Sequence, residues 1–341
     1  MDSLWAVEQN VLTAFSLIGF FVSIIPLAVR YRAWNTGSIL YVSWNAVQCL
    51  VQFVNLLVWR HSDRDIAPGW CDLSVRITWM AGSGMVCSGL LISRTVCKIM
   101  TGAPVPQDRP EKIRALAIEL AIGLGLPCLQ LIVFYILQDQ RYNIYEGVGC
   151  FYSISVTWLY VVLYGGWLLA ISLVSCIYCS FSLYTLFRRR KLLKELTSDN
   201  TSGLTFNRYI RLSIMSFTQL ACVFPLIMFI LIFLVPQLMA PYKGFKAQHA
   251  MLSQVDIYQL DAWFDSAGEA SYMRTIFETT YWLFISASLC FFGIFCFSAS
   301  MKTFYRKAYG AALKLVGRSA GDEGAIESNI VFGGLKLMTC R

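Results

Sequence analysis

The side chains with the clearest chemistry lie in apolar segments. Asp72 and Arg76 stand four residues apart, just before an uncharged run over 77–93, and Glu278 lies one turn into a later apolar segment. A charge near the bilayer centre costs roughly 2.5–3.5 kcal/mol on insertion scales, and less near the interface. Residues at i and i+4 meet on one helix face, so an Asp72–Arg76 ion pair is expected, with Glu278 as the competing partner of Arg76. Either pairing puts charges at the mouth of a helix bundle, where a ligand would enter.

A second polar group is a stripe of amides in the segment 38–59. Asn45, Gln48, Gln52 and Asn55 follow at steps of three, four and three residues, a spacing that places them on one helical face. Within a bilayer such a face must turn toward other helices or toward water. Two interpretations stay open. The favoured one is hydrogen bonding between helices, and the other is that the stripe lines a ligand pocket.

Patterns typical of catalysis or of a metal centre do not stand out. The only histidines are His61 and His249, and most of the 12 cysteines fall inside apolar runs, where cysteine is usually a small hydrophobe. The last apolar segment holds no lysine for a retinal Schiff base. We therefore expect no enzyme, no metal and no cofactor.

The elements that must position these residues are membrane helices. The chain is 57% hydrophobic and 14% charged, with a mean hydropathy of +0.58, whereas soluble domains carry roughly 25% charged residues. A helix needs about 20 apolar residues to span a bilayer. The sequence predicts an all-α membrane protein, a seven-transmembrane helix bundle over 1–300, with spans at about 7–29, 38–59, 72–98, 114–137, 157–187, 212–238 and 275–299.

The basic residues predict the orientation of this bundle. With the amino terminus extracellular and the carboxyl terminus cytoplasmic, 21 of the 28 lysines and arginines face the cytoplasm. Cytoplasmic loops of membrane proteins carry such an excess of positive charge. The net charge of +8 is thereby explained without nucleic acid, and we expect a multi-pass protein of the plasma membrane. Residues 301–341 are expected to form a short cytoplasmic tail, with an amphipathic helix over 302–315 on membrane lipids.

The same topology predicts a disulfide. Cys71 lies at the start of the third span and Cys150 in the loop before the fifth, so both face the oxidising side of the membrane. A bond between them would fix that loop over the mouth of the bundle.

Two stretches carry a resemblance to a known family. The third span begins with GWCDL and ends with ISRTVCKI, and the third cytoplasmic loop reads YTLFRRRKLLKEL, then a Thr/Ser-rich break, then LTFNRYIRL. These motifs resemble the fungal mating receptors for lipidated peptide pheromones, the a-factor receptor type of class D G-protein-coupled receptors. The resemblance implies a prenylated peptide pheromone as ligand and a heterotrimeric G protein as partner.

The predicted sites follow from this resemblance and from the orientation. The residues assigned to the ligand lie at the outer mouth and on the amide stripe: Asp72, Arg76, Glu278, Tyr281, Asn45, Gln48, Gln52 and His249. The residues assigned to the G protein are the basic ones of the third span and the third cytoplasmic loop: Arg94, Lys98, Arg188, Arg189, Arg190, Arg208 and Arg211. Whether the receptor forms a homodimer stays open. The alternative function is a membrane transporter or channel that uses the polar face of the second span.

Overall fold

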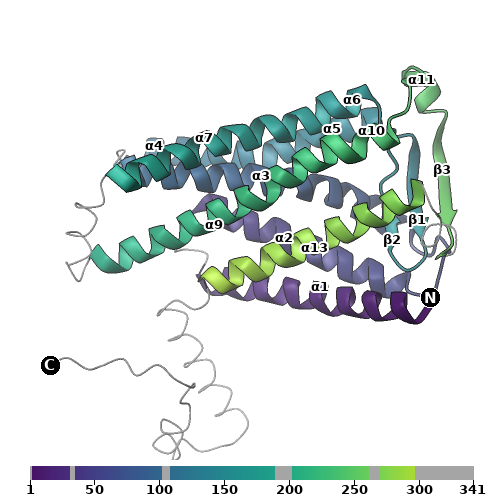
Figure 1. The fold of residues 1–341 in the computed structure, drawn as a ribbon, viewed down its shortest axis with the longest axis horizontal. Coiled ribbons are helices and arrows are strands. Elements are labelled where there is room, and N and C mark those ends of the chain that lie inside the picture. Colours follow the sequence, from purple (N-terminus) through teal and green to yellow (C-terminus); the bar gives the residue numbers. More distant parts are fainter. Residues whose placement is uncertain (1, 31–34, 102–107, 189–201, 261–268, 296–341) are drawn as a thin grey trace, which may run out of the picture. The chain divides into compact units, whose positions relative to one another are not determined.

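The computed structural model describes residues 2–30, 35–101, 108–188, 202–260 and 269–295 (Figure 1). The chain divides into two units, Met1–Ile294 and Phe295–Arg341. The predicted amphipathic helix over 302–315 lies outside the described residues, so it stays a prediction. All that follows concerns the first unit.

Seven helices of the described chain are long and apolar enough to cross a membrane, which agrees with the predicted number of spans. The first three are single helices, whereas the next three continue through short π-helical turns, labelled η. The elements are α1 (Asp2–Arg30), α2 (Thr36–Val58), α3 (Pro68–Thr101), α4 (Arg109–Leu120) with η2 (Ala121–Gly125) and α5 (Leu126–Leu137), α6 (Trp158–Tyr160) with η3 (Val161–Gly165) and α7 (Gly166–Arg188), α9 (Ser202–Phe229) with η4 (Ile230–Leu234) and α10 (Val235–Leu238), and α13 (Glu269–Phe295).

Proline explains two of the π-helical turns. A proline in a helix clashes with the carbonyl of the residue four positions earlier. Four residues before Pro127 is Gly123 in η2, and four before Pro236 is Ile232 in η4. A wider turn at these places relieves the clash without ending the span. Such π-helical turns are frequent at functional sites.

A small sheet at one end of the bundle corrects the prediction of an all-α fold. The strands are β1 (Gln140–Tyr145), β2 (Gly149–Phe151) and β3 (Met251–Tyr258), in the order β2-β1-β3. β1 pairs antiparallel with β2 and parallel with β3. The turn between β1 and β2 uses Gly147 and Gly149 with φ of 83° and 98°, values that suit glycine. We call this end of the bundle the sheet end (Figure 1).

Aromatic clusters anchor the sheet to the helices. Trp59, Trp79, Phe134, Tyr142 and Ile144 are all at most 2% exposed and belong to one cluster with Cys71 and Cys150. A second cluster joins Trp5 of α1, Tyr145 of β1 and Phe277 and Tyr281 of α13. Burying apolar surface is worth roughly 25 cal/mol per Å², so these clusters hold β1 and β2 on the bundle.

Candidate ligand-binding site: a cavity beneath the sheet

The predicted disulfide is present. Cys71, in the first turns of α3, is bonded to Cys150 of β2, and their Cα atoms lie 5.3 Å apart. Both cysteines are buried among the aromatic rings of the first cluster. The bond therefore fixes β2, and with it the sheet, to the start of α3.

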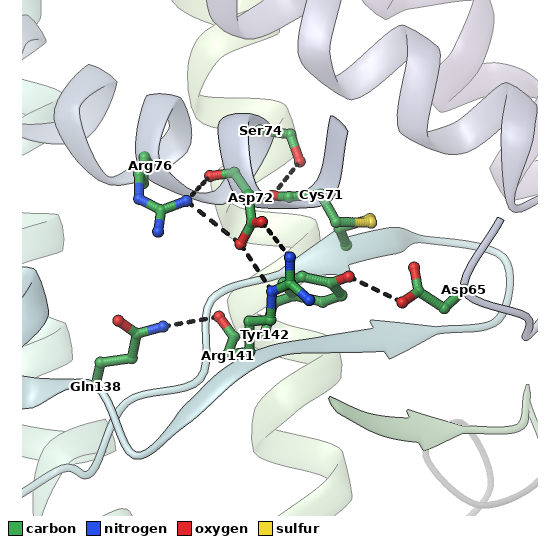
Figure 2. Close-up of polar contacts among 9 residues, drawn as sticks. Asp65, Cys71, Asp72, Ser74, Arg76, Gln138, Arg141 and Tyr142 are labelled. Carbon is green, nitrogen blue, oxygen red and sulfur yellow. Dashed lines mark hydrogen bonds and ion pairs between the residues drawn. A yellow bond between two sulfur atoms is a disulfide. The ribbon is translucent and has the colours of Figure 1, made fainter. Parts of the chain in front are cut away.

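Asp72 holds the neighbouring strand to the same turn of α3 (Figure 2). The Arg141 guanidinium donates through Nε to Oδ1 of Asp72 at 3.2 Å and through a terminal nitrogen to Oδ2 at 2.6 Å. The predicted Asp72–Arg76 pair also forms, with 3.4 Å between Arg76 Nη1 and Asp72 Oδ1. Arg76 also donates to the backbone oxygen of Asp72 at 2.5 Å. Asp72 is thus shared between one expected partner and one from β1.

Two groups of β1 beside this bridge have raised pKa values. The hydrogen bond from Arg141 to Asp72 raises the pKa of the guanidinium above its already high ordinary value. Burial, followed by the hydrogen bond that Tyr142 donates to Asp65 at 3.0 Å, raises the pKa of Tyr142 to about 12. Both groups of β1 therefore keep their protons near neutral pH.

Glu278 forms an ion pair with Arg274 and not with Arg76. Arg274 Nε donates to Glu278 at 2.5 Å, and Arg274 also lies 3.2 Å from Glu8 of α1. Glu278 as the competing partner of Arg76 was therefore wrong. The cause is local, because Arg274 precedes Glu278 by one helical turn on the same face of α13. The resulting triad ties α13 to α1.

Two of the four amides in the stripe of α2 bond to other helices, as the favoured interpretation expects. Gln48 donates to Thr78 of α3 at 3.3 Å, Gln52 to the Thr280 carbonyl of α13 at 3.5 Å, and Asn55 to the Cys150 carbonyl of β2 at 3.2 Å. Asn45 instead donates to the Tyr41 carbonyl of its own helix. A stripe used in this way does not favour a transport path, so no observation supports the transporter or channel alternative.

Two further residues assigned to the ligand hold loops in place. The Tyr281 hydroxyl donates to the Val148 carbonyl, in the turn between β1 and β2, at 3.1 Å. His249 lies 2.8 Å from the carbonyl oxygens of both Phe245 and Tyr135. It thereby links the loop after α10 to the end of α5.

A cavity of about 580 Å³ lies beneath the sheet, within the size range of small-molecule sites. α3 contributes Thr78 and Met85, and η3 and α7 contribute Tyr164, Gly165 and Leu168. The sheet end contributes the polar side chains of Asp139, Gln140 and Asn143. α13 contributes the hydroxyl groups of Thr275, Thr279 and Thr280. The wall formed by α9, η4 and α10 is entirely apolar.

None of the eight residues assigned to the ligand is among those that line this cavity. Gln48 and Gln52 stand one layer behind it, bonded to Thr78 and Thr280 of its wall. Their contact with a ligand stays a prediction. The threonines had a readable signal, because Thr275 and Thr279 stand four residues apart in an apolar span. No sequence pattern pointed to Asp139 and Gln140. These residues lie in a loop of the predicted topology, and only the folded structure places them at the cavity.

The residues assigned to the G protein gather at the opposite end of the bundle. Arg94 and Lys98 lie in the last turns of α3, Arg188 ends α7, and Arg208 and Arg211 lie in the first turns of α9. Arg189 and Arg190 lie outside the described residues. We call this end of the unit the basic end.

A buried polar cluster lies between the cavity and the basic end. The hydroxyls of Ser93 (α3) and Ser216 (α9) are 2.6 Å apart, and Cys179 Sγ (α7) lies 3.2 Å from Ser216 Oγ. Next to them, Gln219 of α9 donates to the Met85 carbonyl of α3 at 2.9 Å. Met85 also lines the cavity. This cluster joins three helices one turn or less from Arg94.

Comparisons with known proteins agree with one another. Residues 11–315 match the sequence model of the STE3 pheromone A receptor family. The chain is 31% identical over 305 residues to the pheromone B alpha 3 receptor of Schizophyllum commune, covering 89% of this chain and 48% of that protein. It is 26% identical over 300 residues to pheromone receptor 1 of Mycosarcoma maydis, covering 88% of this chain and 83% of that one. It is 29% identical over 203 residues to the pheromone a factor receptor of Saccharomyces cerevisiae, covering 59% and 43%. The chain spans about half the length of the Schizophyllum relatives that it matches.

Proposed function

Because this chain belongs to the STE3 pheromone A receptor family, we propose that it binds a prenylated peptide pheromone and activates a heterotrimeric G protein. The family is one of multi-pass plasma-membrane receptors and not of enzymes. The observation that carries the proposal is the pairing of a covered cavity at the sheet end with clustered arginines at the basic end. A ligand and an intracellular partner would thus use opposite ends of one bundle.

A lipidated ligand suits the chemistry of the cavity. The wall formed by α9, η4 and α10 consists only of aliphatic and aromatic side chains. Burying a hydrocarbon chain contributes about 0.8 kcal/mol per CH₂ group, so a prenyl chain would supply much of the binding free energy. The peptide part is proposed to contact the residues predicted at the mouth. Of these, Arg76 keeps 43% of its side-chain surface exposed and Glu278 keeps 34%.

The proposed orientation places the sheet end outside the cell. A disulfide persists in an oxidising compartment, and the Cys71–Cys150 bond lies at the sheet end. Arginines are enriched on the cytoplasmic side, and those of α7 and α9 lie at the other end. Both arguments support an extracellular amino terminus.

Signal transfer would run through the α3–α7–α9 cluster. A ligand shifts a conformational equilibrium only when it binds one arrangement more tightly than the other. Met85 belongs to the wall of the cavity and accepts the Gln219 hydrogen bond, whereas Ser93 directly precedes Arg94. A change in the packing of α9 at the cavity would therefore reach the basic end through few side chains.

Nucleotide exchange tests this proposal. The receptor is reconstituted with a heterotrimeric G protein, and synthetic peptides ending in a prenylated cysteine methyl ester are added beside identical peptides without the prenyl group. We expect a prenylated peptide to accelerate exchange at least tenfold, and its unprenylated counterpart to be far weaker. Equal activity of the two forms would contradict the lipidated ligand, and a lack of exchange with every mating peptide of the source fungus would contradict the receptor function.

A further inference from the structure

The cavity has two ends of opposite chemistry. Toward the sheet it is bordered by Asp139, Gln140 and Asn143, whereas its other wall carries aliphatic side chains of α9, η4 and α10. Among the described residues, no lysine, arginine or histidine lines the cavity. Of the described residues that line it, the one charged side chain is the Asp139 carboxylate.

The polar end carries a carboxylate that has no cationic partner among the described residues. The Asp139 carboxylate accepts hydrogen bonds from the backbone nitrogen of Gln140 at 2.8 Å and from the hydroxyls of Ser153 and Ser155 at 2.6 and 3.3 Å. In the part of the chain that the structure describes, no cation pairs with it. A carboxylate has about four acceptor positions, so Asp139 can accept a further donor.

Two neighbouring side-chain amide oxygens also lack a hydrogen-bond donor. Gln140 Oε1 and Asn143 Oδ1 are buried and have no hydrogen-bond partner among the described residues. Leaving a buried acceptor unsatisfied is costly, and most such groups in native proteins have a partner. A group that donates hydrogen bonds and carries positive charge would complement the Asp139 carboxylate, and the two amide oxygens add unpaired acceptors in the same stretch of chain.

At the apolar end a glycine allows two walls of the cavity to pack closely. A Cβ atom on Gly165 would lie 2.5 Å from Leu231 Cδ2, closer than real Cβ contacts allow. Gly165 therefore lets η3 and η4 approach each other while both border the cavity. The side chains there are hydrocarbon only: Leu226, Ile227, Ile230, Leu231, Leu234 and Leu238.

From these observations we propose that the cavity binds an amphiphile in one direction, with a cationic group at Asp139, Gln140 and Asn143 and a hydrocarbon chain against η4. Asp139 is thereby a binding residue, and the ligand is a positively charged lipopeptide. The inference rests on the proposed function for the identity of the hydrocarbon as a prenyl chain. It adds the direction in which the ligand lies and the sign of its charge.

The test uses a defined probe and two changed forms of it. The probe is glycyl-glycyl-S-farnesylcysteine methyl ester, whose free amino end is positively charged. Its N-acetyl form lacks the charge, and its unfarnesylated form lacks the chain. Binding of each to the full-length receptor in lipid nanodiscs is measured by displacement of a fluorescent farnesylated analogue.

We expect the charge and Asp139 to act together. Acetylation of the probe, or Asp139→Asn, should weaken binding about tenfold, as the loss of a charge-assisted hydrogen bond does. In the Asp139→Asn receptor, acetylation should have no further effect. Asp63→Asn is the matched control, since Asp63 accepts from Gln259 at 3.3 Å and does not line the cavity. Independent losses from acetylation and Asp139→Asn, or no loss from either, would overturn the cationic end.

The hydrocarbon end is tested by filling the cavity and by labelling it. Leu231→Trp should reduce probe affinity more than tenfold, whereas Ile232→Trp, at an exposed position that does not line the cavity, should not. A diazirine on the farnesyl chain needs no variant. It should label residues within 161–168 or 226–238 of the wild-type receptor, and labelling confined to other spans would overturn the assignment.

The outcomes separate this inference from the proposed function. If prenylated peptides drive nucleotide exchange while acetylation and Asp139→Asn show no coupling, the direction of binding is wrong and the receptor function stands. If the coupling and labelling appear but no prenylated peptide drives exchange, the cavity assignment stands and the proposed function fails.

Discussion

Replacing Cys71 by serine is expected to remove nearly all receptor from the cell surface and to abolish probe binding. The bond to Cys150 closes a loop of 79 residues, for which loop closure alone is worth about 4 kcal/mol. The same bond fixes β2 above the cavity. Loss of the disulfide therefore both destabilises the fold and releases the strand that covers the binding site. Surface immunostaining and displacement of the fluorescent farnesylated analogue measure the two effects.

Two variants make this prediction specific. Cys128→Ser changes an exposed cysteine that has no disulfide, and we expect it to behave as the wild type. The double variant Cys71→Ser/Cys150→Ser leaves no unpaired thiol from the bond, and we expect it to fail as the single variant does. Normal surface levels and affinity in Cys71→Ser would show that the disulfide is dispensable.

Neutralising the arginines of the basic end is expected to abolish nucleotide exchange while ligand binding survives. The variant changes five arginines between the end of α7 and the first turns of α9 to glutamine: Arg188, Arg189, Arg190, Arg208 and Arg211. Positive patches raise association rates and affinities for acidic partners, with an effect that salt screens. Exchange should fall more than tenfold, and the dissociation constant of the fluorescent farnesylated analogue should stay within twofold of wild type.

The control removes positive charge at the sheet end. Arg64→Gln combined with Lys243→Gln and Lys246→Gln lowers the net charge without touching the basic end, and exchange should remain near wild type. Unchanged exchange in the five-arginine variant would rule out the basic end as the G-protein surface.

Features that depend on local sequence could be predicted. The seven spans follow from segment length and hydropathy, and the family resemblance found in the third-span and third-loop motifs is confirmed over residues 11–315. The Asp72–Arg76 pair follows from helical periodicity alone. The Cys71–Cys150 bond required only that both cysteines lie on one side of the membrane.

Features that depend on distant pairings could not be predicted. Asp72 and Arg141 are 69 residues apart, and β1 pairs in parallel with β3 from a loop two spans later. The residues of β1, β2 and β3 lie in segments between the spans and show no helical periodicity. The sequence pattern therefore did not predict the sheet. The cavity was missed for the same reason, since Asp139 and the η4 side chains meet only in the folded bundle.

The central claim is that the sheet end with its cavity faces outward and the arginine-rich end faces the cytoplasm. It is tested most directly by epitope tags inserted after Gly244, in the loop next to β3, and within 191–200. In intact cells an antibody should stain the tag after Gly244, and the second tag should be stained only after permeabilisation. The reverse pattern would place the cavity inside the cell and contradict the account.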